Sequence, residues 1–444
     1  MHRFAVSLLA LSLAATPALA QDPGRMQQVI AADADKGEFM GAVLVARDGQ
    51  VLLDRGYGSA NLEWKIPNDG DTKFRLGSIT KQFTAAAILL LQERGKLSLD
   101  APIKTYLPDA PAAWDKVTVR HLLSHTSGIP SFTSFDDYSK SRPLPATLDS
   151  LTARFRDKPL DFQPGEKFAY SNSGYILLTT IVEKASGQPY AAFVTDNIFK
   201  PLGMADSGYD SHAAVLPRRA SGYTPSPRGV INTDYIDMTI PQGAGALYST
   251  THDLLKWNAG LFGGKLLKPE SLKAMTTPVK DKYALGLFVA NVDGATMINH
   301  GGGIEGFNTW LGYDPDRKLT VVVLGNLNSG APDRLGKSLM TLARGGNVVL
   351  PAERRAITVP AAKLREYEGT YELSPTFAVT MKVEGGKLTT QATGQDAFEL
   401  FAEKPDQFFL KVADAQVSFT RDAGGKVTGL VLHQHGRDMP AKRK

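Results

Sequence analysis

A serine and a lysine stand three residues apart at Ser78 and Lys81, within the segment SITK. Three residues span almost one turn of a helix, so the two side chains would lie on the same face. An amine within reach of a hydroxyl can accept its proton, and a helix N-terminus favours negative charge on the oxygen. The spacing therefore suits a nucleophilic serine with a lysine base. By itself, the pattern is more often a serine cap followed by a surface lysine.

A tyrosine and an asparagine, Tyr170 and Asn172, lie between a predicted turn at residues 163–166 and a predicted helix that begins near Ser173. A phenol with a pKa of about 10 is a poor base at neutral pH, but neighbouring cations could lower that pKa. Taken alone, this segment is better explained by a tyrosine at an interface and an asparagine that caps the helix.

The segment HGGGIEG, residues 300–306, follows a predicted strand and fits the pattern G-x-G-x-x-G. A dinucleotide-binding loop with this pattern must be followed by a helix, whereas the next residues predict a strand, a turn and another strand. A nucleotide site is therefore not expected. Glycines beside a strand can instead let a substrate backbone approach closely, or offer an amide N–H to an oxyanion.

Metal and cysteine chemistry receive little support. His121 and His125 are four residues apart and could face one metal ion, but no HExxH motif is present, so structural roles are favoured. The chain has no cysteine, which excludes disulfides, thiolate–zinc sites, iron–sulfur clusters and a cysteine nucleophile. No G-x-S-x-G motif occurs, which argues against an α/β-hydrolase. We expect neither a metal nor an organic cofactor.

The composition is that of an ordinary globular protein. Of 444 residues, 43% are hydrophobic and 21% charged, and the net charge is only +5, with 50 basic against 45 acidic side chains. The charges are scattered, so no nucleic-acid partner is expected. Residues 1–20 resemble a signal peptide with an apolar run and an A-x-A site, so we predict cleavage after Ala20. The mature protein would then be periplasmic or secreted, with no stable membrane anchor.

The elements that must position these residues form two predicted units. Strands are expected at 41–66, 284–299 and 307–325, and a long buried helix at 78–96; further helices are expected near 117–124, 146–156, 174–186, 190–198 and 251–262. This pattern predicts an α/β (α+β) domain over 21–347, with strands at both ends and helices between. Residues 348–362 suit a linker, and 363–444 predict a small antiparallel β-barrel or sandwich of five or six strands.

The three motifs together resemble those of the penicillin-recognising serine hydrolases. This family includes class C β-lactamases, D-alanyl-D-alanine carboxypeptidases, D-aminopeptidases and β-lactamase-like esterases. The similarity spans about residues 28–345 and includes the segments FRLGSITKQFTAAAILLLQERGKLSLDAPI, TVRHLLSHTSGIP, PGEKFAYSNSGY and HGGGIEGF. It implies an antiparallel sheet flanked by helices, plus an all-helical region. Residues 363–440, which open with LREYEGTYEL, are similar to a lipocalin-like β-domain appended to some members.

The resemblance also implies a mechanism. Ser78 would attack a carbonyl carbon and form an acyl-enzyme, while Lys81 and Tyr170 would act as a coupled acid–base pair. Asn172 would hydrogen-bond Lys81 and the substrate amide. The backbone N–H groups of Ser78 and Gly303 would form the oxyanion hole.

The third motif departs from the family. β-Lactamases of this type usually carry Lys-Thr-Gly and carboxypeptidases often His-Thr-Gly, whereas here His300 is followed by Gly301 and Gly302. We expect His300 to be among the catalytic residues and the two glycines to contact substrate. Gly301 replaces the threonine, and a histidine is only partly charged near neutral pH. A substrate carboxylate would therefore have fewer partners, which disfavours efficient β-lactam hydrolysis.

A peptidase or esterase of this family, acting on a small-molecule, peptide or ester substrate, is the favoured prediction. A D-alanyl-D-alanine carboxypeptidase or penicillin-binding protein, or a class C-like β-lactamase, is the first alternative. A non-catalytic peptidoglycan sensor is the second. The C-terminal β-domain is expected to act as a lid or substrate gate. The natural substrate and the oligomeric state stay open at this level.

Overall fold

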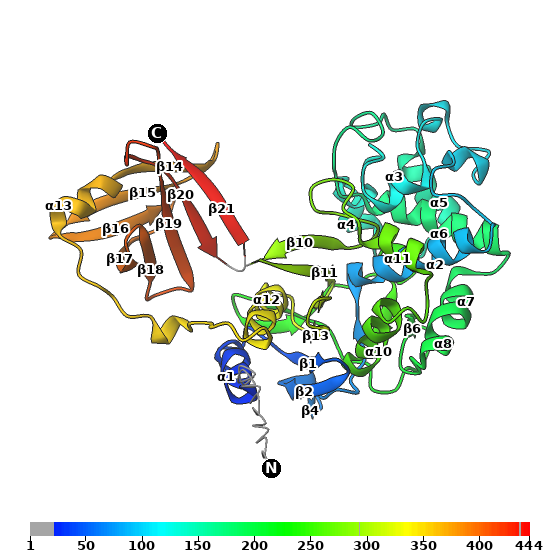
Figure 1. Ribbon diagram of the computed structural model, residues 1–444, viewed down its shortest axis with the longest axis horizontal. Coiled ribbons are helices and arrows are strands. Elements are labelled where there is room, and N and C mark those ends of the chain that lie inside the picture. The colour runs from blue at the N-terminus through cyan, green and yellow to red at the C-terminus, as the bar shows by residue number, and fades with distance from the viewer. Residues whose placement is uncertain (1–21, 293, 435–436) are drawn as a thin grey trace, which may run out of the picture.

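The computed structural model describes residues 22–292, 294–434 and 437–444. The predicted signal peptide at 1–20 lies outside these residues. Figure 1 shows a larger part built from helices and a sheet, and a separate barrel formed by the C-terminal strands. The expected fold class, an α/β domain followed by a β-barrel, is confirmed. Among the described helices, none is both long and apolar enough to cross a membrane.

A six-stranded antiparallel sheet forms the centre of the larger part. Its order is β10-β11-β12-β13-β1-β2. The strands are β1 (Gly41–Arg47), β2 (Gln50–Tyr57), β10 (Phe288–Val292), β11 (Ala295–Ile304), β12 (Phe307–Asp314) and β13 (Leu319–Gly325). β1 pairs with β13 along its whole length, so strands from the two ends of this domain are joined in one sheet. Both strands are rich in buried β-branched residues, as expected of a sheet covered on both faces.

Helices cover the two faces of this sheet. Val43 and Val45 of β1 pack in one core cluster with Leu335 of α12 (Ala331–Ala343) and Ile30 of α1 (Pro23–Ala34). Leu44 points to the opposite face, into the larger core cluster. This alternation follows from the two-residue period of a strand. Neither α1 nor α12 was expected from the sequence.

The predicted buried helix is confirmed as α2 (Thr80–Glu93), whose residues 80–91 are all buried. It packs against α6 (Asn172–Ser186), which also starts at a motif residue. The helix begins two residues later than predicted, because residues 77–79 form a 3-10 turn, η1 (Gly77–Ile79). Ser78 therefore lies in that turn, directly before α2.

The region between the sheet strands is mostly helical, as predicted. Its helices are α3 (Val119–Leu123), α4 (Tyr138–Ser141), α5 (Leu148–Arg156), α7 (Tyr190–Val194), a π-helical turn (Thr195–Phe199), α8 (Lys200–Leu202), α9 (Gln242–Gly245), α10 (Thr251–Phe262) and α11 (Pro269–Thr276). Short strands are β3 (Ser59–Asn61), β4 (Ile66–Pro67), β5 (Phe74–Arg75), β6 (Gly208–Tyr209), β7 (Tyr223–Ser226), β8 (Gly229–Asn232) and β9 (Leu247–Ser249). Short 3-10 turns are η2 (Ile103–Thr105), η3 (Ala112–Trp114), η4 (Phe132–Ser134), η6 (Pro351–Glu353) and η7 (Arg365–Tyr367).

The C-terminal part is a closed eight-stranded antiparallel barrel with a short helix, α13 (Ala361–Leu364), before it. Its strands are β14 (Gly369–Ser374), β15 (Phe377–Glu384), β16 (Lys387–Ala392), β17 (Ala397–Lys404), β18 (Gln407–Leu410), β19 (Ala415–Arg421), β20 (Val427–Gln434) and β21 (Arg437–Arg443). The predicted number of five or six strands was too low. The barrel has its own core, which includes Tyr371, Phe408 and Phe419. The boundaries predicted at 347 and 363 stay predictions.

Candidate active site

Ser78 and Lys81 are brought together as the spacing predicts. The Ser78 Oγ lies 3.1 Å from the Lys81 Nζ. The lysine is fully buried, and its Nζ donates hydrogen bonds to the Asn172 Oδ1 at 2.9 Å and the backbone carbonyl of Ala244 at 2.8 Å. Burial lowers the pKa of Lys81 well below its ordinary value, because the charged form is poorly solvated there. The Ala244 carbonyl could not be anticipated, since it depends on how α9 packs beside α2.

Asn172 is the first residue of α6, and its amide is held from both sides. The Nδ2 donates to the Thr133 Oγ1 at 3.0 Å, so the Oδ1 is turned toward Lys81. The backbone N–H of Asn172 donates to the Ser131 Oγ at 3.1 Å. Thr133 and Ser131 therefore position an asparagine that the sequence identified, although neither was itself predicted to contribute.

Tyr170 lies beside Lys81, whose Nζ is 4.8 Å from the centre of the tyrosine ring. Tyr170 is 37% exposed, yet the protein atoms packed around its phenol disfavour the charged form and raise its pKa above the ordinary value. A hydrogen bond with Ser78 partly offsets that rise. The idea that neighbouring cations lower the pKa of Tyr170 is therefore wrong, because desolvation is the larger effect.

The glycine run lies in β11, directly beside the turn that carries Ser78. A Cβ atom added to Gly302 would lie 1.9 Å from the Leu76 carbonyl oxygen, and one added to Gly77 would lie 2.8 Å from the Gly303 nitrogen. Gly77 also has φ +54°, a conformation that favours glycine. The close contact between these two segments requires residues without side chains, and it brings Gly303 next to Ser78.

His300 is buried and neutral. Its Nδ1 lies 2.6 Å from the Gly301 carbonyl oxygen, which can only accept, so this nitrogen carries the proton. Its Nε2 then accepts from the Tyr283 hydroxyl at 3.1 Å. Burial, with the charge of Lys81 nearby, lowers the pKa of His300 to about 3. The expectation of a partly charged histidine near neutral pH is therefore wrong.

His125 holds the segment that carries Tyr170. It has φ +58°, its Nδ1 accepts the Ser171 backbone N–H at 3.1 Å, and its own carbonyl accepts the Ala169 N–H at 2.9 Å. The imidazole and Tyr170 ring centres are 4.1 Å apart. The Nδ1 of His121 accepts the Thr118 N–H in a helix cap. Within the described residues, no group of three or more His, Cys, Asp or Glu side chains could hold a metal ion.

Two cavities meet at Ser78, Gly303 and Asn328. One has a volume of about 490 Å³ and includes Asn172; the other has about 700 Å³ and includes Tyr170 and Lys337. In the described part of the chain, their lining residues all come from the α/β domain and none from the barrel. The predicted gating role of the barrel stays a prediction.

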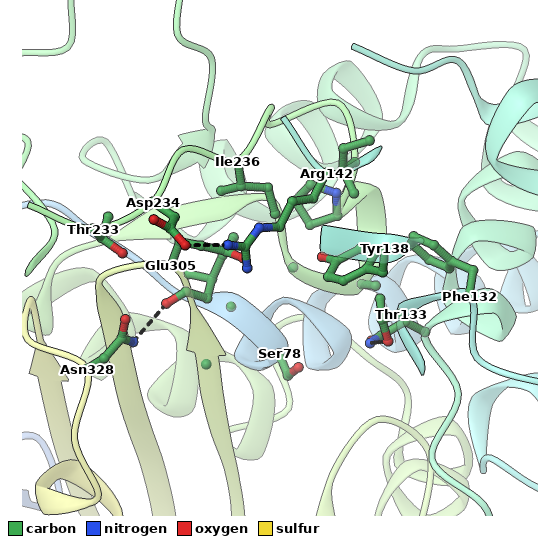
Figure 2. A pocket seen from close by; sticks show the side chains of 18 of the residues that line it. Ser78, Phe132, Thr133, Tyr138, Arg142, Thr233, Asp234, Ile236, Glu305 and Asn328 are labelled. Atoms are coloured by element: carbon green, nitrogen blue, oxygen red, sulfur yellow. Dashed lines mark hydrogen bonds and ion pairs between the residues drawn. The ribbon is translucent and has the colours of Figure 1, made fainter. Parts of the chain in front are cut away.

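Three charged residues on the wall of the smaller cavity were not identified from the sequence. Arg142 binds the Glu305 Oε1 through its Nη1 at 2.7 Å and the Asp234 Oδ2 through its Nη2 at 2.6 Å. Figure 2 shows the arginine reaching between the two carboxylates, with Ser78 across the cavity. Burial, with Glu305 nearby, raises the pKa of Tyr138 in the same wall to about 12. These residues come from separate segments, so their spacing in the sequence carries no motif.

A protein-family model described as Beta-lactamase matches residues 26–343, well over half of the chain. The chain belongs to the beta-lactamase family. A second family model, described as a domain of unknown function (DUF3471), matches residues 353–443, the segment that contains the barrel. The predicted resemblance of this beta-lactamase family member to penicillin-recognising serine hydrolases is confirmed.

The protein is 28% identical over 438 residues to penicillin-binding protein 4* of Bacillus subtilis (strain 168). This alignment covers 92% of this chain and 96% of that protein. Among solved structures, it is similar to the octameric penicillin-binding protein homologue from Pyrococcus abyssi, with a TM-score of 0.70, 27% identity, and coverage of 95% and 100% of the two chains. It is also similar to the D-amino acid amidase from Ochrobactrum anthropi SV3, with a TM-score of 0.64, 25% identity, and coverage of 72% and 98%.

Proposed function

We propose that this protein is an exported serine hydrolase that cleaves an amide, peptide or ester bond through an acyl-enzyme on Ser78. Membership of the beta-lactamase family supports the reaction class. The A-x-A pattern that ends at Ala20 supports export. Peptidase or esterase activity is favoured over β-lactamase activity, because Gly301 offers no hydroxyl and His300 no charge to a substrate carboxylate.

The set of neighbours around the Lys81 Nζ carries this proposal. The Ala244 carbonyl and the Asn172 Oδ1 can only accept hydrogen bonds, so they take the two N–H groups of a neutral amine. The lone pair of that amine is then left for the third neighbour, Ser78, whose Oγ lies 3.1 Å away. Because burial lowers the pKa of Lys81, the neutral form exists well below the ordinary lysine pKa. Lys81 is thus arranged to accept the Ser78 proton.

The rest of the reaction follows from the neighbouring groups. As the Ser78 oxygen attacks the carbonyl carbon, the N–H groups of Ser78 and Gly303 would stabilise the developing oxyanion, at about 3 kcal/mol per donor. Tyr170, held as a neutral phenol, would give its proton to the leaving group and regain one from Lys81. Water would then attack the acyl-enzyme, with the same pair removing its proton and returning one to Ser78.

Intact-protein mass measured after mixing with a p-nitrophenyl ester tests the proposal. We expect a transient increase by the mass of the acyl group, with a burst of p-nitrophenol. Ser78→Ala should abolish both, whereas Ser374→Ala, a change of an exposed serine in the barrel strand β14, should leave both unchanged. Undiminished turnover by Ser78→Ala would refute the assignment of the nucleophile.

A penicillin-binding or carboxypeptidase activity is the second candidate, favoured by the similarity to penicillin-binding protein 4* over nearly the whole chain. A persistent adduct of one penicillin mass on Ser78 would support it. Rapid penicillin turnover, with the catalytic efficiency of a dedicated enzyme, would instead show a β-lactamase. A non-catalytic sensor would form no adduct with either the ester or the drug.

A further inference from the structure

We infer that the smaller cavity at Ser78 selects acyl groups that end in a protonated amine, and that Glu305 determines this specificity. The inference rests on the proposed function, because it requires that Ser78 forms an acyl-enzyme. The inference specifies the charge of the preferred substrate, which the catalytic residues do not determine.

The two cavities take different halves of the substrate. Tyr170, the proposed proton donor to the leaving group, lines the larger cavity together with His300. Asn172 lies on the other side of Ser78 and lines the smaller cavity. A leaving group must lie on the side of the residue that protonates it. The acyl group is therefore placed in the smaller cavity, on the side of Glu305.

The charged wall of this cavity carries one net negative charge. It contains two carboxylates, Glu305 and Asp234, and one guanidinium, Arg142. Both terminal nitrogens of Arg142 already bind these carboxylates, and its Nε is buried without a hydrogen-bond partner among the described residues. A substrate anion would thus face two carboxylates and a guanidinium that is already paired. A cation would instead be attracted to both acidic groups.

Glu305 is better suited than Asp234 to bind this cation directly. The side chain of Glu305 is 13% exposed, whereas that of Asp234 is 80% exposed. A carboxylate with little water around it interacts more strongly with a nearby charge. Only the Oε1 of Glu305 takes part in the described ion pair, so its second oxygen is available for an ammonium group.

The separation of Gly303 and Glu305 limits the length of the acyl group. Glu305 is the first residue of the turn after β11, two residues beyond Gly303, and two residues of chain span at most about 7 Å. An ammonium group bound there would lie several methylene groups from the reacting carbonyl. Phe132, Ile236 and Ile240 line the same cavity and give an apolar wall against which such a spacer can pack. A lysine-like chain, or the free N-terminus of a second residue, has this form.

Three p-nitrophenyl esters of equal chain length test the inference. Their acyl groups are aminohexanoyl, heptanoyl and carboxyhexanoyl, which end in an ammonium, a methyl and a carboxylate group. We expect kcat/KM for the ammonium ester to exceed that for the methyl ester by about tenfold, the size of one partly screened charge contact. The carboxylate ester should be the poorest substrate. Added salt should reduce these differences.

Charge-neutralising variants make the test specific. Glu305→Gln should bring the ratio of kcat/KM for the ammonium ester to that for the methyl ester close to one. Combining it with Asp234→Asn leaves Arg142 as the sole charge of this group and should make the carboxylate ester the best of the three. Glu399→Gln removes a carboxylate paired with Lys387 in the barrel, and should leave all three ratios unchanged.

The possible failures can be told apart. If no ester acylates Ser78, the proposed function itself is wrong. If all three acylate it but the methyl or carboxylate ester is preferred by the wild-type protein, only the inferred specificity is overturned. An ammonium preference that persists in Glu305→Gln would assign the selectivity to other residues and would also refute the role of Glu305.

Discussion

The protonation state of one side chain, Lys81, controls the proposed chemistry. Burial lowers its pKa, so the neutral amine becomes populated at a lower pH than in water. Acidification protonates it and removes the base, so acylation should slow as the pH falls through the Lys81 pKa. His300, with a pKa of about 3, is neutral on both sides of pH 7 and should not contribute an ionisation there.

Lys81→Arg is the sharpest test of this assignment. Arginine keeps a positive charge but does not lose its proton in proteins, so it cannot act as the base. We expect the acylation rate to fall by about 100-fold or more. The fall in the rate of the ester burst at low pH, measured by stopped flow, should also disappear. If the variant keeps both the wild-type rate and this fall at low pH, Lys81 is not the base.

His125 offers a second test, because its proposed role is to position Tyr170. His125→Asn keeps a hydrogen-bond acceptor for the Ser171 N–H and tolerates the positive φ, whereas His125→Leu provides neither. We expect His125→Leu to lower kcat by about tenfold or more, with little change in KM, and to lower the melting temperature. His125→Asn should restore much of both. Equal loss of kcat in the two variants would contradict the positioning role.

The sequence predicts those residues of the candidate site that share a local motif. It does not predict those that are far apart in the sequence and come together only on folding. The helical spacing of Ser78 and Lys81 is visible in the sequence, and their contact is confirmed. The neutrality of His300 depends on Tyr283 and on burial, which the sequence does not show. Arg142 and Glu305 are 163 residues apart, and no spacing rule connects them.

Among the structural elements, the contact between β11 and the turn before α2 most directly affects catalysis. Gly302→Ala would place a methyl group against the Leu76 carbonyl and push β11 away from Ser78. We expect kcat to fall by about 100-fold, the loss typical of one oxyanion donor. Gly301→Ala is the matched control, because its new Cβ would lie 3.6 Å from the nearest atom, an ordinary contact. Comparable losses in both variants would contradict the steric explanation.

Some helices and strands could be predicted from the sequence and others could not. The strands β12 and β13 and the helix α2 carry dense apolar patterns, and all three are confirmed. α12 was missed although its buried residues Leu335, Leu339 and Ala343 recur every four positions, so the signal was present. The barrel strands are short and separated by turns, which makes their number hard to count. Whether such strands close into a barrel depends on non-local pairing that a sequence pattern does not encode.

At the scale of the whole molecule, the two parts have separate hydrophobic cores. We therefore expect two unfolding transitions in calorimetry. Phe408→Ala should lower only the barrel transition, by about 3–5 kcal/mol in unfolding free energy, and leave the ester burst intact. Phe83→Ala, which removes a ring stacked on Trp257, should lower the other transition and the burst together. A single transition shifted by both variants would show that the two parts unfold as one unit.

β1 and β13 are neighbours in the sheet, although they are far apart in the sequence and are therefore synthesised at different times. β1 ends at Arg47 and β13 begins at Leu319. The β1–β2 hairpin therefore cannot pair with β13 until most of the chain has been translated. Such long-range pairing is slow to form, because a long loop must close first. Ser78 likewise cannot meet Gly303 until both have been synthesised. A nascent chain that ends before β11 therefore carries the nucleophile without the strand that completes its cleft.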